Sequence, residues 1–330
     1  MTTWTGYLAP ENYTGELRAE LARAGMAIVA EHDRLLIGAG DAYPAAWAQN
    51  VWYDVQDLAV PSIKCAARTL RGMQRNWALL PTDGPYRRAR LIADQLPHVG
   101  FKPLTFPRAP PAAPLGGWTL LAPDRMLAAP ATASPFPHGE PSFVADRDGP
   151  PNRAYLKLWE ALTVLGVRPA PGATCLDLGA APGGWSHVLA DLGATVTAVD
   201  KAPLDARVAA RPNVTERRES AFGLRPREVG PVDWLVSDVV CYPDRLLELI
   251  RRWRDSGMAR NVIATIKFQG ETDFDAVDAF KAIPGGRLMH LYHNKHELTF
   301  AWVGDVSLGS ERSFASAGMP IRSSPKGEGT

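Results

Sequence analysis

The chain has 330 residues, of which 46% are apolar, and a formal net charge of +1. This composition excludes a disordered chain, and the length allows two globular domains. No apolar run approaches the roughly 20 residues of a membrane helix, and residues 2–16 lack the apolar core of a signal peptide. The three cysteines show no disulfide or metal-ligand spacing. We therefore expect a cytoplasmic protein that uses neither membrane nor metal.

The first part of the chain, residues 1–145, predicts an α+β domain that proline interrupts repeatedly. Residues 47–58 are aromatic and apolar at a spacing that suits either a helix or a strand. A stretch rich in Pro, Gly and Asp at 136–151 indicates a domain boundary near residue 145. The other expected elements, in chain order, are a helix at 16–24, a strand hairpin at 26–30 and 35–38, a helix at 85–96, and strands at 118–122 and 125–128.

A basic segment runs through this region from Lys64 to Arg108. It contains nine Lys or Arg residues against two acids, a net charge of +7. Such a segment can neutralise the phosphates of a nucleic acid, although a solvated basic surface is an equally good interpretation of the charges alone.

The second part, residues 146–305, alternates strands and helices regularly. This pattern predicts a parallel sheet covered by helices, with an antiparallel hairpin at its end. Residues 306–330 are rich in Ser, Gly and Pro and predict a disordered tail. The expected strands are 174–178, 195–199, 232–237, 261–266, 287–292 and 297–303, and the expected helices are 153–165, 185–192, 246–253 and 274–282.

A glycine turn joins the first of these strands to its helix. Its spacing, Gly-x-x-x-Gly-Gly, is neither the dinucleotide fingerprint nor a phosphate loop. Asp200 ends the next strand, where an acid suits hydrogen bonds to two ribose hydroxyls, unless it only caps a helix. The turn thus predicts a site for a nucleoside-bearing cofactor. Its candidate residues are Gly179, Ala181, Pro182, Gly183, Gly184, Trp185, Asp200, Ser220 and Asp238.

Four further polar residues stand at the ends of expected elements. Asp238 and Lys267 follow apolar strands, Lys157 lies on the entering helix, and Glu297 begins the last strand. Neighbouring strand ends converge on one crevice, where a lysine among carboxylates and another cation has a tunable pKa. A ribose hydroxyl becomes a good nucleophile only when a base removes its proton. Taken singly, Lys157 and Glu297 also suit ordinary surface positions.

With these motifs, residues 152–303 resemble the FtsJ-type RNA ribose 2′-O-methyltransferases, which use S-adenosylmethionine. That family carries a Lys-Asp-Lys-Glu tetrad, matched here by Lys157, Asp238, Lys267 and Glu297. The resemblance implies a Rossmann-like methyltransferase sheet with Lys267 as the base. Two departures are Ser220, where an acid often lies beside the adenine, and Ala154, where a serine is common.

Within that family the chain most resembles the large-subunit methyltransferase M group, which modifies a cytidine of 23S rRNA. Three segments carry this resemblance: the run from Leu291 to Glu297, the Ser134-Pro135-Phe136 loop and the segment from Trp47 to Trp52. The resemblance implies an RNA-binding, THUMP-like N-terminal domain, which looks shortened here. Methylation of tRNA or another RNA, and RNA binding without catalysis, are the alternatives; a dehydrogenase has the wrong glycine spacing.

Overall fold

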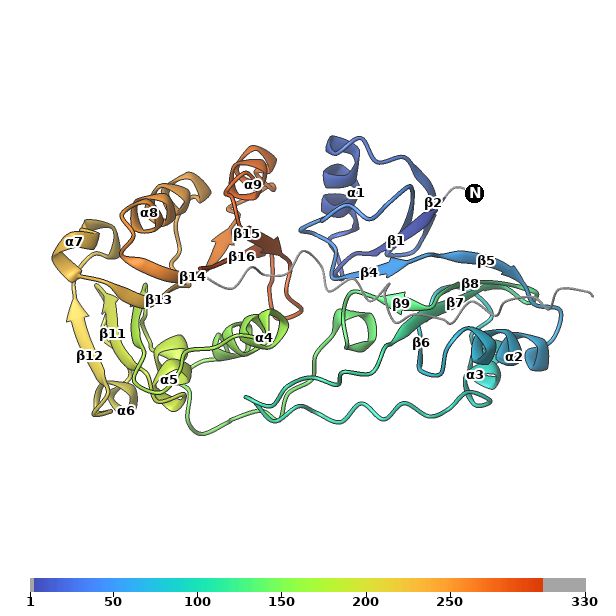
Figure 1. Ribbon diagram of the computed structural model, residues 1–330, viewed down its shortest axis with the longest axis horizontal. Coiled ribbons are helices and arrows are strands. Elements are labelled where there is room, and N and C mark those ends of the chain that lie inside the picture. The colour runs from blue at the N-terminus through green and yellow to red at the C-terminus, as the bar shows by residue number, and fades with distance from the viewer. Residues whose placement is uncertain (1–2, 305–330) are drawn as a thin grey trace, which may run out of the picture.

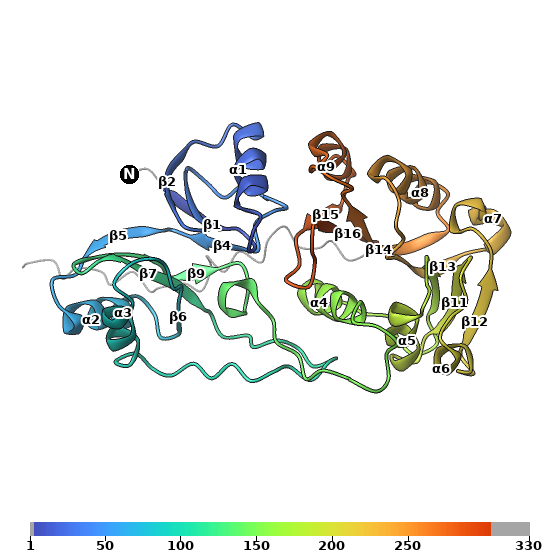
Figure 2. The same ribbon diagram turned by 180° about the vertical axis from the view of Figure 1, so that it is seen from behind.

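The computed structural model describes residues 3–304, which form three β-sheets of five, four and seven strands (Figures 1 and 2). The expected tail at 306–330 lies outside the described residues. The five- and four-stranded sheets come from the first part of the chain, and the seven-stranded sheet comes from the second.

The seven-stranded sheet has the order β12-β11-β10-β13-β14-β16-β15. Its strands are parallel except β16, which runs antiparallel to both of its neighbours. The predicted parallel sheet with a terminal antiparallel hairpin is therefore confirmed. The strands are β10 (Thr174–Leu178), β11 (Thr195–Asp200), β12 (Val214–Arg218), β13 (Val232–Ser237), β14 (Ala259–Lys267), β15 (Gly286–Met289) and β16 (Glu297–Val303).

Helices cover both faces of this sheet, as Figure 1 shows. Because strand side chains alternate, Val262 and Ala264 pack toward α8 and α9, whereas Ile263 packs toward α4 and α5. Burial on both faces explains why these strands are almost continuously apolar. The helices are α4 (Tyr155–Leu165), α5 (Gly184–Asp191), α6 (Ala206–Ala209), α7 (Pro226–Val229), α8 (Pro243–Asp255) and α9 (Phe274–Lys281), with a 3-10 turn at Ala221–Gly223.

The five-stranded sheet has the order β2-β3-β1-β4-β9 and carries α1. The expected hairpin is confirmed, because β2 pairs antiparallel with β3. The segment 47–58, which the sequence left undecided, forms β4 and β5, separated by Asp54 with a φ of 54°. The elements are β1 (Trp4–Leu8), α1 (Thr14–Arg23), β2 (Ile28–His32), β3 (Leu35–Ala39), β4 (Asn50–Tyr53) and β9 (Ala131–Thr132).

The four-stranded sheet has the order β5-β8-β7-β6 and packs against α2 and α3. The expected pair of strands β7 and β8 and the helix α3 are present, but the sequence patterns gave no prediction for α2 or β6. The elements are β5 (Gln56–Ala59), α2 (Ile63–Met73), β6 (Trp77–Leu79), α3 (Tyr86–Ala93), β7 (Gly116–Ala122) and β8 (Arg125–Ala129), followed by a 3-10 turn at Pro137–Gly139.

The five- and seven-stranded sheets share one apolar core. Trp47 and Leu17 belong to the same buried cluster as Phe300 of β16. The buried carboxylate of Glu20 on α1 accepts hydrogen bonds from the backbone of residues 46 and 47, each 2.8 Å long, and pairs with Lys281 of α9. Separating the two parts of the chain would therefore expose core residues and an unpaired buried carboxylate.

Candidate active site

The order in which the chain adds strands to the seven-stranded sheet reverses next to β10. The chain proceeds from β10 outward to β11 and β12, then returns to place β13 on the other side of β10. Ligands of open α/β sheets bind at such a switch point, outside the carboxyl ends of the strands. The glycine turn follows β10, and Asp238 follows β13, so both lie at this point.

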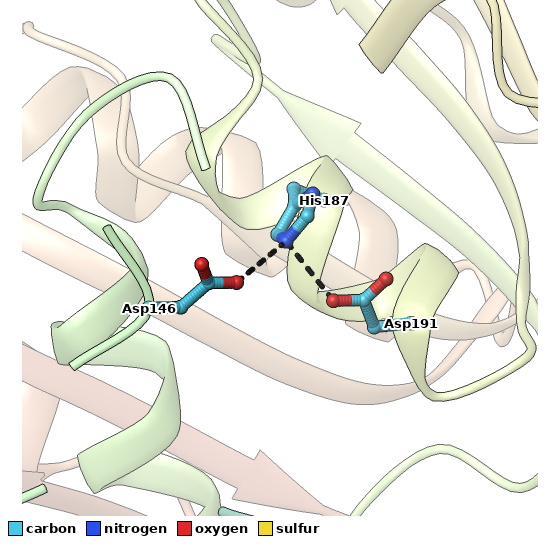
Figure 3. Close-up of side chains that lie close together, drawn as sticks. All are labelled: Asp146, His187 and Asp191. Atoms are coloured by element: carbon cyan, nitrogen blue, oxygen red, sulfur yellow. Dashed lines mark ion pairs between the residues drawn. The ribbon is translucent and has the colours of Figure 1, made fainter. Parts of the chain in front are cut away.

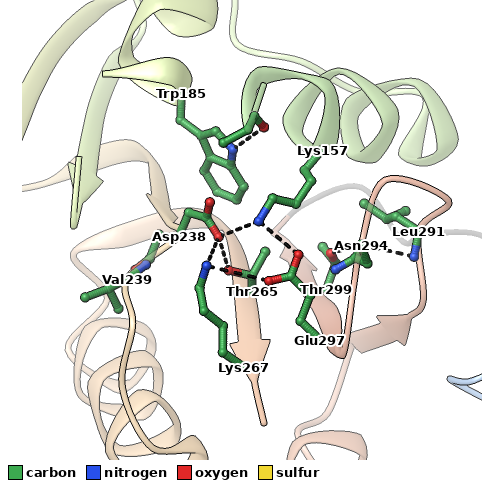
Figure 4. Close-up of polar contacts among 12 residues, drawn as sticks. Lys157, Trp185, Asp238, Val239, Thr265, Lys267, Leu291, Asn294, Glu297 and Thr299 are labelled. Atoms are coloured by element: carbon green, nitrogen blue, oxygen red, sulfur yellow. Dashed lines mark hydrogen bonds and ion pairs between the residues drawn. The ribbon is translucent and has the colours of Figure 1, made fainter. Parts of the chain in front are cut away.

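Lys157, Asp238, Lys267 and Glu297 meet at this edge in one network (Figure 4). Lys157 Nζ lies 2.9 Å from both Asp238 Oδ1 and Glu297 Oε1. Lys267 Nζ lies 2.7 Å from Asp238 Oδ1 and 3.6 Å from Glu297 Oε2. Glu297 reaches the site because antiparallel β16 begins at the edge where β14 ends, with Glu297 opposite Lys267.

The network is largely removed from water, since its four side chains are only 9–20% exposed. Burial acts to lower the pKa of Lys157, but the carboxylates of Asp238 and Glu297 outweigh it and raise that pKa above the ordinary lysine value. Burial acts to raise the pKa of Asp238, but Lys157 and Lys267 outweigh it and lower that pKa. Lys157 and Asp238 are therefore both held in their charged forms.

The glycine turn is held by the neighbouring strand. The N–H groups of Gly179 and Ala180 both donate to Val199 O, at 2.9 and 3.2 Å. The N-cap residue of α5 is Gly183, which has no side chain to cap the first turn that begins at Gly184. The Ser186 backbone N–H bonds to the buried Asp177 carboxylate, whereas the N–H groups before it and the positive end of the helix dipole remain available for an anionic group of a ligand.

The glycines of the turn pack closely against neighbouring segments of the protein. A Cβ on Gly179 would lie 2.6 Å from Val239 Cβ, and one on Gly184 would lie 2.2 Å from Asn152 Oδ1. Gly179 and Gly183 also have φ values of 78° and 113°, which disfavour other residues. Close packing of the turn explains these three positions.

Asp200 ends β11 beside the turn, as expected. Its Oδ2 accepts from Ala181 N at 3.1 Å, and its Oδ1 accepts from Ala202 N at 2.9 Å. Each carboxylate oxygen can accept a second bond, so these contacts leave capacity for ribose hydroxyls. Ser220 follows β12, and the residue before it, Glu219, donates its N–H to Asp200 O at 3.1 Å. The turn, Asp200 and Ser220 thus lie along one edge.

Trp185 is buried at the start of α5. Its side chain is 3% exposed within the core between α4 and α5, and its Nε1 donates to Ala154 O at 2.9 Å. Figure 4 shows this bond above Lys157. The indole therefore anchors the helix that carries Lys157, and its ring offers no open face to a cofactor.

Asp177 is a polar residue that sequence reasoning missed. It lies within β10, is 1% exposed, and accepts a 2.6 Å hydrogen bond from Ser186 Oγ, while its Oδ1 has no partner among the described residues. Burial raises the pKa of this carboxyl to about 7. An acid in an otherwise apolar buried strand was the available signal.

A second charged cluster joins α5 to the segment that enters the sheet (Figure 3). His187 Nε2 lies 3.0 Å from Asp191 Oδ2 and 3.6 Å from Asp146 Oδ2, a ligand set of the kind that can hold a metal ion. Arg211 lies 2.7 Å from Asp191 and 3.3 Å from His187 Nδ1. Because Arg211 already supplies a cation here, the arrangement is sufficiently explained as a structural ion pair.

Residues 150–292 match the family model described as FtsJ-like methyltransferase. The match includes Lys157, Asp238 and Lys267, and Glu297 lies just beyond its end. This part of the chain is therefore similar to the FtsJ-like methyltransferases, and the seven-stranded sheet is a Rossmann-like α/β fold.

Relatives in this class carry a more specific name. The chain is 41% identical over 173 residues to the "Ribosomal RNA large subunit methyltransferase M" of Halorhodospira halophila, covering 50% of each. It is 37% identical over 190 residues to the protein of that name from Alkalilimnicola ehrlichii, covering 53% of this chain and 52% of the other. The chain thus spans about half the length of these relatives. A fibrillarin pre-rRNA processing protein of Methanococcus jannaschii overlaps with a TM-score of 0.35 at 19% identity, covering 55% of this chain and 80% of the other.

Proposed function

We propose that this protein methylates the 2′-hydroxyl of a ribose in RNA with S-adenosylmethionine, and that its substrate is a cytidine of 23S rRNA. The observation that carries the proposal is the buried network of Lys157, Asp238, Lys267 and Glu297 at the switch point. The match to FtsJ-like methyltransferases and the names of the relatives support this choice of chemistry and substrate.

The geometry favours Lys267 as the base. Lys157 contacts both carboxylates at 2.9 Å and is held charged by them, so it is poorly suited to accept a proton. Lys267 is the more exposed lysine, at 20% against 12%, and makes one short ion pair instead of two. As a neutral amine, Lys267 Nζ would accept the hydroxyl proton and become an ammonium, which Asp238 and Glu297 would stabilise.

The residues at the glycine turn suit the cofactor. S-adenosylmethionine, when bound, would supply a methyl group on a sulfonium sulfur; the activated ribose oxygen would bond to that methyl carbon as the C–S bond breaks, and the sulfur would leave as a neutral thioether. The uncapped first turn of α5, at Gly183 and Gly184, suits a carboxylate, and Asp200 suits ribose hydroxyls. The backbone of Ala181, Pro182 and Trp185 would line this edge, with the hydroxyl of Ser220 as a neutral partner for adenine.

The N-terminal part would supply the affinity for RNA. We propose a division into an RNA-binding, THUMP-like unit at 1–145 and a methyltransferase unit at 146–305, supported by the separate sheets. The two helices α2 and α3 pack together through their apolar faces. Their exposed basic residues face solvent and suit phosphates; these residues are Lys64, Arg68, Arg71, Arg87 and Arg90.

Transfer of a labelled methyl group to purified transcripts tests the proposal. Large-subunit rRNA, small-subunit rRNA and tRNA are compared with the full chain, and the modified ribose is mapped. We expect transfer to large-subunit rRNA at a ribose oxygen. Transfer to tRNA alone would correct the substrate, whereas RNA binding without transfer to any class would contradict catalysis. Among residues 3–304, no helix has the length and apolar character that a membrane span requires.

A further inference from the structure

The loop between β15 and β16 borders the reactive network. In Figure 4, Leu291 and Asn294 lie beyond Glu297, on the opposite side of the network from Val239. Asn294 Oδ1 accepts from Leu291 N at 3.1 Å and from Thr299 Oγ1 at 3.2 Å. The loop is therefore tied to β16, the strand that begins with Glu297.

The same loop is clamped to α4 by a buried carboxylate. Glu160 is 2% exposed and accepts hydrogen bonds from Tyr292 N at 2.7 Å, His293 N at 3.0 Å and His293 Nδ1 at 2.6 Å. Glu160 follows Lys157 by three residues, so both side chains project from neighbouring positions on one face of the helix. The helix that supplies Lys157 thus also sets the position of residue 292.

Tyr292 stays in solvent although its backbone is anchored. Its side chain is 46% exposed, and its ring meets His293 edge to face with centroids 5.3 Å apart. Exposed tyrosines are common, but the described residues include only eight large apolar residues that are at least 41% exposed. Three of the eight flank the network, namely Tyr292 before Glu297, and Val240 and Tyr242 just after Asp238.

We infer that Tyr292 stacks against a nucleobase of the RNA next to the methylated nucleotide, and that Glu160 is the residue that positions it. The inference rests on the proposed function. A base must be unstacked from its neighbours for its ribose to enter the crevice, and an aromatic ring can replace the lost stacking. Stacking on an aromatic side chain contributes about 1–3 kcal/mol per base, equivalent to about 5- to 150-fold in affinity.

Variants of the full chain test this role. Tyr292→Ala should weaken binding of a single-stranded rRNA fragment by about 5- to 150-fold and raise its KM, while the affinity for S-adenosylmethionine is unchanged. Tyr292→Phe keeps the ring and should retain RNA affinity. Val29→Ala removes a comparably exposed apolar side chain, 51% against 46%, from β2 and serves as the control.

Glu160→Gln tests the positioning role, because it removes the charge that binds three donors. If Glu160 acts through Tyr292, the double variant should bind RNA no more weakly than Tyr292→Ala alone. A 2-aminopurine placed beside the target nucleotide reports stacking directly, and Tyr292→Ala should change its fluorescence in the complex. Additive losses in the double variant would overturn the role of Glu160.

The outcomes separate this inference from the proposed function. If the natural protein methylates rRNA and Tyr292→Ala matches it in KM and RNA affinity, the stacking role is wrong and the proposed function stands. If Tyr292→Phe loses as much affinity as Tyr292→Ala, the hydroxyl and not the ring binds RNA, which also overturns stacking. If the natural protein binds rRNA without methylating it, the proposed function fails, whereas the binding comparison still decides the role of Tyr292.

Discussion

The two charged regions of this protein are built in opposite ways. On α2 and α3, six basic residues lie close together, and within the described residues 3–304 no ion pair joins any of them to a carboxylate. At the carboxyl edge of the seven-stranded sheet, two lysines meet two carboxylates at 2.7–3.6 Å. Paired and buried charges define a geometry, whereas unpaired surface charges attract a polyanion from a distance.

The comparison suggests a division of labour between the two regions. The network at the sheet edge has almost no net charge, so it attracts a distant polyanion only weakly. Its atoms are nevertheless held within hydrogen-bond distance of each other. The helices α2 and α3 impose no such geometry on a ligand, yet their charge favours any RNA. Substitutions in the first region should therefore affect the rate, and substitutions in the second should affect binding.

The largest effect is expected at Lys267. Lys267→Ala should lower the single-turnover rate by about 10²- to 10⁴-fold, because it removes the proposed base. Lys267→Arg should be nearly as inactive, since arginine keeps the charge but cannot give up its proton usefully. Lys295→Ala, an exposed lysine at the same edge, is the control and should keep its rate at saturating RNA. An active Lys267→Arg enzyme would show that Lys267 only neutralises charge.

A smaller effect is expected at Asp200. Asp200→Ala should weaken the binding of S-adenosylmethionine by about 1.5–3 kcal/mol, the range for hydrogen bonds to a charged group. Asp200→Asn keeps one of the two acceptor oxygens that serve Ala181 N and Ala202 N, and its affinity should lie between those of the alanine variant and the natural protein. Calorimetry measures both, and unchanged affinity in folded Asp200→Ala protein would remove Asp200 from the site.

The basic helices should give a smaller effect for each residue. Arg68→Glu and Arg90→Glu should each weaken RNA binding at low salt and reduce the dependence of log K on log salt by about 0.7–0.9 per lost phosphate contact. Cofactor affinity should not change. Arg227→Glu on α7 is the control, because Arg227 has the same charge as Arg68 and Arg90 and is also exposed. Equal losses from Arg227→Glu would contradict the assignment of RNA affinity to α2 and α3.

The smallest effect on activity is expected at Asp177, whose substitution should instead change the pH dependence of stability. Burial raises the pKa of this carboxyl from 3.8 to about 7, so its contribution is most favourable below pH 3.8 and is lost as pH rises through 7. Relative to Asp177→Asn, the natural protein should lose stability as the pH rises between those two values. Above pH 7, the difference in stability between the two proteins should stay constant. Thermal unfolding from pH 4 to 8 measures this, and a constant difference would contradict the raised pKa.

Local patterns in the sequence determined most of the seven-stranded sheet. The strands at Thr174–Leu178, Val232–Ser237 and Glu297–Val303 have the predicted bounds, because strands buried on both faces are short apolar runs with polar ends. The edge strand β12 was missed, since its residues Thr215 to Arg218 are polar and suit an edge. The meeting of Asp238 with Lys267 was also readable, because parallel strands bring their carboxyl ends to one edge, and Glu297 joins them as the first residue of the antiparallel β16.

Contacts between distant segments were decided only by the tertiary structure. No local pattern shows that Trp47 shares a core with Phe300, or that Glu20 pairs with Lys281. The reason is that packing joins residues by shape across the whole chain, whereas periodicity reports only which side of an element is buried. The burial of the Trp185 indole and the clamp of Glu160 on the loop at Tyr292 have the same origin, since each depends on a partner that the sequence places far away.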